Sequence, residues 1–320
     1  MADSSPSLSE PGAAPAKVAV LLATKNGAAF LDEQLRSLAG QTWPAIDVWA
    51  SDDGSTDATV AILSQWRERW SRGAFTLLDG PRAGFAENFR FLLACDAGNA
   101  DYVAFCDQDD LWEREKLSRA IGWMRSQDAA VPLLFCSRTY TVTERGDVVG
   151  MSPLFRRKPS FRNALVQSLA GGNTMVMNRP ASRLLARAAR RSPFVSHDWL
   201  AYQIVTGAGG VVRYCKEPLV RYRQHGGNVV GANTSMEARL ARLKLLLDGR
   251  FKRWTDANLA SLGCNRDLLT PDALAALDEF AEARQGNMLG AMARLRRSGV
   301  YRQTLQGTLG LWGAALFRLL

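Results

Sequence analysis

Acidic side chains gather in one short stretch near the middle of the chain, where they could bind a cation. The stretch is Asp107-Gln108-Asp109-Asp110, and it follows an aromatic and β-branched run, 101–104, that predicts a buried strand. Alternate side chains of an extended backbone point the same way, so Asp107 and Asp109 would face one side together. Two carboxylates held close together are unfavourable unless a cation lies between them. A solvated acidic turn before a helix explains the same residues about equally well.

A second acidic turn, Asp52-Asp53-Gly54, follows another predicted strand at 46–50. Both carboxylates could accept hydrogen bonds from ribose hydroxyls or from a base N–H group. The local pattern slightly favours a structural role instead, with Ser55 or Thr56 capping the next helix. Because the chain has neither a G-x-G-x-x-G pattern nor a phosphate-binding G-x-x-x-x-G-K-[ST] loop, a bound pyrophosphate would need another positive partner. A metal at the first acidic turn would supply it.

The chain contains two histidines, His197 and His225, and each lies in a polar segment. A lone histidine is usually a surface residue, but His197 precedes Asp198 at a predicted helix start and His225 precedes two glycines. Asp198 has a structural explanation as well, because a carboxylate in the first turn is favoured by the helix dipole.

Alternating strand and helix patterns must position these residues. A continuous apolar run at 18–23 is typical of a central parallel strand, and helical spacing follows it between residues 30 and 38. The same alternation continues to residue 94 and predicts a right-handed α/β sheet. Further strands are expected at 133–136, 140–143 and 175–177, with an edge strand at 219–225, whereas residues 112–117 have helical character.

Composition limits the class of protein. The chain has 320 residues, of which 47% are hydrophobic and 22% charged, which suits one large α/β domain with an appendage. The net charge of +9 favours anionic partners such as nucleotides, phospholipid surfaces or nucleic acid. Five cysteines without a C-x-x-C spacing indicate free thiols in a reducing cytosol and argue against a zinc site.

The two ends of the chain differ from its middle. Residues 1–16 are rich in Ser, Pro, Ala and Gly and are expected to form a disordered leader. Residues 233–320 are expected to form a basic helical region, with an amphipathic helix at 238–247 and a capped helix start at Thr270-Pro271. The apolar segment 305–320 is too short to span a membrane; it would lie in a bilayer interface or dock on the main domain or a second subunit.

Taken together and in this order, the polar turns resemble the family 2 inverting glycosyltransferases of the GT-A fold. The resemblance runs from about residue 17 to residue 228. The segments flanking the D-x-D turn and His225, 106–112 and 224–228, look like the bacterial rhamnosyltransferase branch. The matching pieces are Thr24 and Asn26, the turn 52–57, the D-x-D turn Asp107-Gln108-Asp109, the turn Gly171-Gly172-Asn173, and His197-Asp198-Trp199.

The resemblance implies a GT-A type nucleotide-binding mixed sheet flanked by helices at 17–232, followed by the helical extension. It also implies that Asp198 is the general base that takes the acceptor hydroxyl proton. Lys25 stands where the family usually has a tyrosine that stacks on the base, so Lys25 would reach a phosphate or point to solvent. By the same resemblance, the donor is held by Thr24, Asn26, Asp52, Asp53, Asp107 and Gly172, and Mg²⁺ or Mn²⁺ by Asp107, Asp109 and His225.

The expected function is metal-dependent transfer of a sugar, rhamnose in the rhamnosyltransferase branch, from a nucleoside diphosphate to a saccharide or lipid-linked acceptor in cell-surface polysaccharide synthesis. The expected location is the cytoplasm, at the inner face of the cell membrane, with an anionic membrane surface as a partner. Two alternatives are a non-catalytic basic module that binds nucleic acid or membrane, and a nucleotidyltransferase. Nucleic acid is not expected as a partner, because no RNP, helix-turn-helix or finger pattern occurs.

Overall fold

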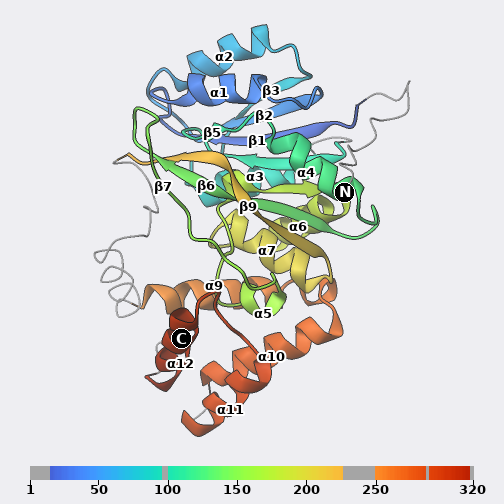
Figure 1. Cartoon of the computed structure of the whole chain (residues 1–320), viewed down its shortest axis with the longest axis vertical. Coiled ribbons are helices and arrows are strands. Elements are labelled where there is room, and N and C mark those ends of the chain that lie inside the picture. The colour runs from blue at the N-terminus through green and yellow to red at the C-terminus, as the bar shows by residue number, and fades with distance from the viewer. Residues whose placement is uncertain (1–14, 96–99, 226–248, 286–287, 318–320) are drawn as a thin grey trace, which may run out of the picture.

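The structure, a computed structural model, describes residues 15–95, 100–225, 249–285 and 288–317 (Figure 1). One mixed sheet runs through the upper part of the molecule in the order β3-β2-β1-β4-β8-β6-β9-β5, and β7 pairs with β6. The strands are β1 (Val18–Thr24), β2 (Ile46–Asp52), β3 (Phe75–Asp79), β4 (Tyr102–Cys106), β5 (Leu111–Trp112), β6 (Leu133–Val142), β7 (Val148–Met151), β8 (Val176–Asn178) and β9 (Val211–Arg223).

Helices cover both faces of this sheet, and further helices form the end of the molecule that carries the C-terminus (Figure 1). The helices of the sheet region are α1 (Leu31–Ala39), α2 (Thr59–Arg69), α3 (Phe85–Ala94), α4 (Lys116–Arg125), α5 (Phe161–Ala164), α6 (Arg179–Arg191) and α7 (His197–Gly207). Those of the C-terminal end are α9 (Arg250–Gly263), α10 (Pro271–Gln285), α11 (Met288–Ser298) and α12 (Leu305–Leu316), and short 3₁₀ turns lie at Gly172–Thr174 and Arg266–Leu268.

The parallel half of the sheet brings the predicted polar turns to one edge. Strands β3, β2, β1 and β4 run parallel, as the continuous apolar pattern of β1 predicts, since both faces of β1 are buried. The register pairs Thr24 with Asp52 and Leu22 with Cys106, so β1, β2 and β4 end at nearly the same level. Their carboxyl ends are where an open α/β sheet places a ligand.

The mixed half of the sheet corrects three sequence expectations. Residues 133–136 and 140–143 are parts of one strand, β6. Residues 219–223 of the predicted edge strand 219–225 belong to the 13-residue β9, which lies between β6 and β5. Trp112, expected in a helix, is in β5, where it pairs with Val220 of β9. Sequence spacing misses these pairings because β5 has only two residues and therefore shows no periodicity.

Apolar residues on the two faces of the sheet form two cores. Alternate residues of β1 point to opposite sides, so Val20 joins the core beneath α1, α2 and α4, and Leu21 joins the core beneath α3, α6 and α7. The core beneath α3, α6 and α7 continues into the C-terminal helices through Leu277 and Phe280 of α10 and Leu311 of α12. These helices therefore share buried surface with the sheet.

The C-terminal segment has a buried side and an exposed side. Leu311, Ala314 and Ala315 of α12 are buried in the shared core, which agrees with the docked alternative for this segment. In the described ranges, no helix has the length and apolar character needed to cross a membrane. Thr270 caps α10 as expected, since its Oγ1 accepts a hydrogen bond from the Ala273 amide. The expected helix at 238–247 and residues 1–14 of the expected leader lie outside the described residues.

We expect Leu277→Ala to lower the free energy of unfolding by about 2–5 kcal/mol, because it leaves a cavity in the core shared by the sheet and α10. Leu277 is 3% exposed, whereas Leu305 of α12 is 76% exposed, so Leu305→Ala is a matched control with an expected change within about 0.5 kcal/mol. Urea denaturation followed by circular dichroism measures both. Equal effects of the two substitutions would show that α10 does not contribute to the common core.

Candidate active site

Hydrogen bonds between side chains and backbone fasten the loops at the ends of β1, β2 and β4 to one another. Thr24 Oγ1 donates to Asp52 Oδ1 at 3.0 Å, and Asn26 Oδ1 accepts from the Thr56 amide at 2.8 Å. The Asn26 amide in turn donates to Ser55 Oγ at 2.8 Å. Asn26 has a φ of 48°, a left-handed conformation that asparagine tolerates better than most residues. The first two polar turns are thus one connected structure.

Gln108, the middle residue of the D-x-D turn, connects the third loop. Its Oε1 accepts from the Lys25 amide at 2.8 Å and its Nε2 donates to the Lys25 carbonyl at 3.0 Å. A Cβ on Gly27 would lie 2.2 Å from Gln108 Oε1, so only glycine leaves room for this pairing. The Lys25 ammonium donates to the carbonyls of Asp53 and Gly54 at 2.7 and 2.6 Å. Lys25 is exposed, in agreement with one of its two expected roles, and its ammonium group also holds the second loop.

The carboxylates of Asp52 and Asp53 are buried and organise the loops around them. Asp52 accepts from the Ser55 amide at 2.7 Å and from Ser55 Oγ at 2.6 Å. Asp53 accepts from the amides of Ala83 and Gly84, at 3.2 and 2.8 Å, where α3 begins. The capping role expected for Ser55 or Thr56 is wrong, because α2 begins one residue after Ala58 and has no side-chain cap. Ser55 instead binds Asp52.

Four carboxylates converge at the end of β4. Burial and the negative charges of Asp110, Asp109 and Asp198 hold the pKa of Asp107 well above its ordinary value. Burial, together with the charge of Asp109, raises the pKa of Asp110 to about 7. Asp198, which lies in a helix, and Asp107, which lies at a strand end, are thus close enough for their charges to interact. The sequence places Asp107, Asp109 and Asp110 together in one acidic stretch, but it does not place Asp198 beside them.

Buried polar groups beneath the turn stabilise Asp110. Asn173 Nδ2 donates to its Oδ2, and the Arg223 amide donates to its Oδ1 at 3.1 Å. Lys116, which is fully buried, donates to the Asn173 carbonyl at 2.5 Å and lies 3.0 Å from the centre of the Trp112 ring. Burial holds the pKa of Lys116 well below its ordinary value, opposed by the charges of Asp110 and Asp107. The network supports the acidic turn from below.

Arg223, at the end of β9, joins the acidic turn to two other elements. Its side chain is 2% exposed, and Nε donates to the Asp109 carbonyl at 3.1 Å. Its two terminal nitrogens reach the Glu144 carbonyl and, at 2.5 Å, the Glu33 carboxylate of α1. His225 follows, with Nε2 at 2.8 Å from Asp109 Oδ2. Two of the three predicted metal ligands, Asp109 and His225, are thus in direct contact.

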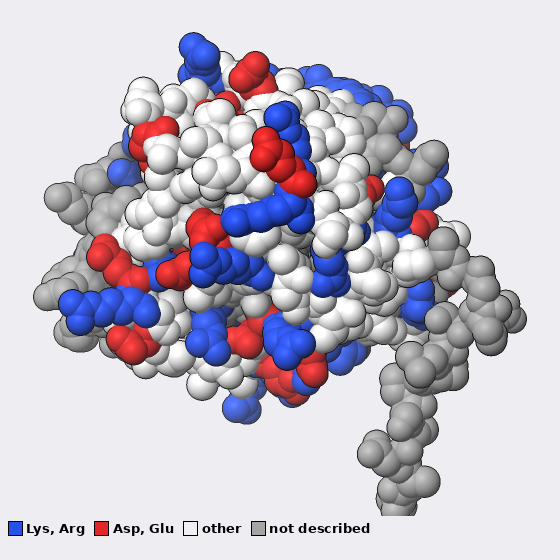
Figure 2. All heavy atoms as spheres, turned by 90° about the horizontal axis from the view of Figure 1, so that it is seen from above, with Lys and Arg blue, Asp and Glu red and all other residues white. Residues whose placement is uncertain are grey.

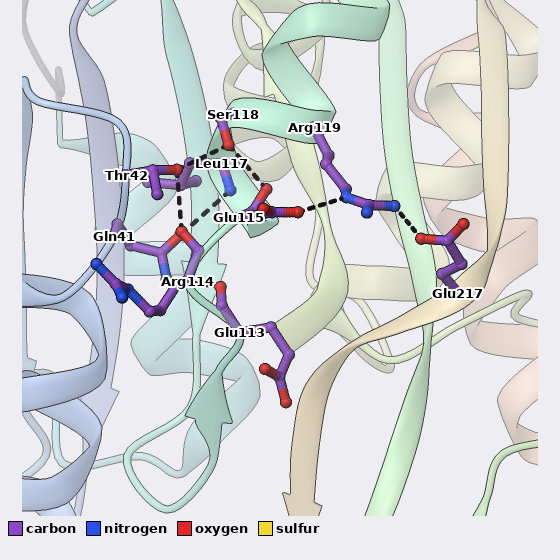
Figure 3. A network of polar contacts seen from close by, with 9 residues as sticks. All are labelled: Gln41, Thr42, Glu113, Arg114, Glu115, Leu117, Ser118, Arg119 and Glu217. Carbon is purple, nitrogen blue, oxygen red and sulfur yellow. Dashed lines mark hydrogen bonds and ion pairs between the residues drawn. The ribbon is translucent and has the colours of Figure 1, made fainter.

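The segment that follows the acidic turn is fixed from both sides (Figure 3). Gln41, in the loop after α1, donates to the Glu113 carbonyl at 2.9 Å and accepts from the Leu117 amide at 3.2 Å. On the other side, Arg119 of α4 pairs with Glu115 and with Glu217 of β9. Because these contacts come from the loop after α1 and from β9, they connect the start of α4 to both sides of the site.

Gly172 and His197 pack against each other at the side of the site formed by α7. A Cβ on Gly172 would lie 1.9 Å from His197 Nε2. The His197 ring is stacked on Phe89 at 3.7 Å between centroids and meets Phe105 edge-on at 4.6 Å. Both ring nitrogens are buried without a hydrogen-bond partner among the described residues. His197 is therefore a core residue, which corrects its expected place in a polar turn.

Asp198 occupies the first turn of α7, as expected, and is partly buried. Ser168 Oγ donates to its Oδ2 at 3.0 Å, which orients the carboxylate and leaves its other oxygen for another partner. The carboxylate interacts electrostatically with Asp107 across the site. This arrangement suits a group that accepts a proton from a hydroxyl placed between α7 and the acidic turn.

The residues of the acidic turn fit a hard divalent cation by their chemistry. Among the described residues, no group of three or more His, Cys, Asp or Glu side chains is already arranged to hold a metal ion. The Asp107 carboxylate, however, receives no hydrogen bond from the described residues and faces the like charges of Asp109, Asp110 and Asp198. Oxygen ligands are those that Mg²⁺ and Mn²⁺ prefer, and a cation would offset this repulsion.

Comparison with known proteins identifies the family. The model of glycosyl transferase family 2 matches residues 19–184, which is more than half of the chain. The chain belongs to glycosyl transferase family 2. The dTDP-rhamnosyl transferase RfbG of Shigella flexneri is 27% identical over 241 residues, covering 72% of this chain and 81% of that protein. The teichuronic acid biosynthesis glycosyltransferase TuaG of Bacillus subtilis, whose assignment is given as putative, is 29% identical over 114 residues, 35% of this chain and 44% of that protein.

Solved structures share the fold of this family 2 glycosyltransferase. The TarS 1–349 structure from S. aureus, in complex with UDP-GlcNAc, superposes with a TM-score of 0.51 at 17% identity, covering 89% of this chain and 93% of that chain. A longer TarS chain also gives 0.51, and there this chain covers 43% of its length. The expected GT-A type mixed sheet, flanked by helices and followed by C-terminal helices, is confirmed, as is the expectation of a glycosyltransferase.

Sequence reasoning missed several residues that hold the site. Gln108, Lys116, Ser168 and Arg223 all act through hydrogen bonds to residues far away in the chain. One signal was present for Lys116, because helical spacing places it on the buried side of α4 with Ala120 and Met124. Arg223 gave no comparable signal, since a strand that ends in Arg-Tyr-Arg reads as exposed.

We expect Gly172→Ala to destabilise the protein by about 1–3 kcal/mol, because His197 is held between two phenylalanine rings and cannot move aside. The penalty should shrink by about 1 kcal/mol or more in a His197→Ala background, which removes the clash. Thermal unfolding of the four proteins in this double-mutant cycle measures the coupling. Gly122→Ala on α4 is the control, since nothing lies near its Cβ position. Additive effects would contradict the packing described here.

Lowering the pH should reduce stability through His197. Burial lowers the pKa of His197 to about 4 from its ordinary 6.5, although the nearby Asp198 charge opposes this change. Above pH 6.5 the ring is neutral in both states; below it the unfolded chain takes up the proton first, so stability is lost as the pH falls towards 4. Between these values the wild type should lose about 2–3 kcal/mol more than His197→Asn, measured by urea unfolding at each pH. Parallel curves would mean that His197 keeps an ordinary pKa.

Proposed function

We propose that this glycosyltransferase moves a sugar from a nucleoside-diphosphate donor to a saccharide or lipid-linked saccharide acceptor, with inversion and with Mg²⁺ or Mn²⁺. The observation that carries the proposal is the placement of Asp107 and Asp109 at the end of β4, with Asp198 of α7 near enough for its charge to act on Asp107. The similarity to a dTDP-rhamnosyl transferase favours rhamnose as the sugar and cell-surface polysaccharide as the product. Such a reaction belongs to the cytoplasm, at the inner face of the cell membrane.

In this proposal the three fastened loops hold the donor. Thr24, Asn26, Asp52 and Asp53 form the nucleoside side of the site, and their mutual hydrogen bonds fix its shape before a ligand arrives. Gly172 leaves space on the other side of the site, because a larger side chain at this position would displace His197. A divalent cation bound by Asp107 and Asp109, with His225 beside them, would stabilise the negative charge on the leaving diphosphate as a Lewis acid.

Asp198 is proposed as the general base. Its carboxylate accepts a hydrogen bond from Ser168 at one oxygen, so the other oxygen can take the proton of the acceptor hydroxyl as that oxygen attacks the sugar. Proton transfer to a positioned carboxylate contributes roughly 10²–10⁴-fold in rate. A single base, without a carboxylate nucleophile on the opposite face of the sugar, corresponds to direct displacement.

We expect Asp198→Asn to lower turnover by about 10²–10⁴-fold while donor binding is retained, and Asp109→Asn to abolish metal-dependent donor binding. Thermal-shift assays with UDP, dTDP, GDP and CDP, each with and without Mn²⁺, measure binding, because a ligand of the native state raises apparent stability. Release of nucleoside diphosphate measures turnover.

Asp128→Asn is the matched control for these variants. Asp128 lies before β6, at the opposite end of the strands, and its carboxylate only accepts from the Ala130 amide at 2.9 Å, which an asparagine oxygen can also do. Wild-type shifts and rates are expected for it. A folded wild-type protein that shows no shift with any nucleotide, or an Asp198→Asn variant that keeps full turnover, contradicts the proposal.

A further inference from the structure

Helix α12 carries an exposed apolar face without charged residues. Leu305 and Leu309 are 76% and 63% exposed, and Leu316 and Phe317 are exposed at the other end of the helix. Leu305, Leu309, Trp312 and Leu316 recur at helical spacing and share one face, opposite to Leu311 and Ala314 in the core. Residues 303–317 contain neither acidic nor basic side chains. A surface helix of a globular protein usually has a charged outer face, so this face is suited to an apolar environment.

A basic loop is fastened beside the beginning of α12. Arg156, Arg157 and Lys158 are exposed in the loop between β7 and α5. Tyr301 Oη donates to the Lys158 carbonyl at 2.7 Å, and the Arg157 guanidinium lies 3.7 Å from the centre of the Tyr301 ring. Tyr301 is four residues before Leu305. Two segments separated by more than a hundred residues in the chain therefore form one surface.

Hydrogen bonds fix the geometry of that surface. Arg157 Nη1 donates to the Arg302 carbonyl at 3.3 Å. The Arg302 amide donates to Thr308 Oγ1 at 3.1 Å, so the residue that contacts the basic loop is also tied to the second turn of α12. The basic loop and the apolar face of α12 are thus held together as parts of one folded unit.

The two chain segments that form this surface contain basic but no acidic residues. No aspartate or glutamate occurs in residues 148–197, which include the basic loop, or in residues 288–317, which include α11 and α12. Around α1 and α2, basic and acidic side chains are interspersed on the face seen in Figure 2. In Figure 1 the C-terminal helices lie at the end of the molecule away from α1 and α2.

We propose that α12 and the basic loop 156–158 form a docking surface for an anionic lipid bilayer. In this arrangement α12 lies in the plane of the interface with Leu305, Leu309 and Leu316 in the acyl region, and the basic loop contacts lipid phosphates. Apolar insertion combined with basic side chains is the chemistry of an interfacial helix. A second protein copy would satisfy the apolar face but would bring the like charges of two basic loops together.

This inference deepens the cellular location proposed above, and it rests on different residues from the donor site. Its test is the binding of the full-length protein to vesicles, which needs neither donor nor acceptor. A failure here leaves nucleotide binding untouched, and a failure of nucleotide binding leaves the lipid surface untouched, so the two outcomes are distinguishable.

The experiment is flotation of the protein with vesicles of phosphatidylglycerol mixed with phosphatidylcholine, and with vesicles of phosphatidylcholine alone. Binding to the anionic vesicles is expected to exceed binding to the neutral ones and to weaken with added salt. Leu309→Asp should reduce the partition constant at least about tenfold, since it places a charge in the apolar layer. Arg156→Glu combined with Lys158→Glu should reduce it roughly 25-fold or more, from about fivefold for each basic residue lost.

Matched controls come from α2 at the other end of the molecule. Val60 is 41% exposed and Arg67 is exposed, so Val60→Asp and Arg67→Glu introduce the same kinds of change far from the proposed surface. Both should bind vesicles as the wild type does, and circular dichroism should show that all variants are folded. Equal binding to neutral and anionic vesicles, or equal losses in the controls, would overturn the proposal. So would a Leu309→Asp variant that converts a dimer to a monomer, by sedimentation velocity, without changing vesicle binding.

Discussion

Repulsion among carboxylates at the end of β4 is the constraint on which the rest of the site depends. A buried carboxylate is unfavourable unless it is hydrogen-bonded, protonated or paired with a cation. Asp110 is stabilised by Asn173 and by the amide of Arg223, whereas Asp107 is left for another partner. The protein thus separates two neighbouring acidic residues into one that supports the turn and one that can serve a ligand.

Support for this turn comes from elements that are distant in the sequence. Arg223 ends the longest strand and joins the turn to α1, and Lys116 connects it to the loop before β8. The same β9 also binds the start of α4 through Glu217. A site with several like charges needs rigid surroundings. If the supporting elements could move, repulsion would push the carboxylates apart into solvent, and they would no longer point at the same place.

Much of the fold could be predicted from the sequence. The strand β1 and the turns after β1, β2 and β4 were predictable because apolar runs, glycine and aspartate act locally, and parallel strands bring their ends together. The placement of β5 and β9 was not, since strand pairing over a hundred residues apart leaves no periodicity. For the same reason His197 was misplaced: its burial depends on Phe89, Phe105 and the missing side chain of Gly172.

The candidate site was predicted in its residue types but not in its internal connections. Thr24, Asp52 and Asp53 do lie at one sheet edge, yet their side chains bind mainly to neighbouring loops. Carboxylate oxygens can accept more than one hydrogen bond, so in the proposed donor role Asp52 and Asp53 can accept from a nucleoside while keeping these contacts. Tertiary contacts, such as those of Lys25 with the carbonyls of the second loop, decide which oxygens can still accept a hydrogen bond from a ligand.

The fastening of the three strand-end loops has a consequence for ligand affinity. Loops that must become ordered around a ligand lose conformational entropy, and that loss is subtracted from the binding free energy. Here Asn26, Gln108 and Ser55 hold the loops in place through hydrogen bonds within the protein itself. In their proposed role on the nucleoside side of the site these loops would be preorganised, so differences in affinity between donors would arise from direct contacts and from desolvation. A substitution that loosens these loops would weaken every donor alike, without changing the preference among them.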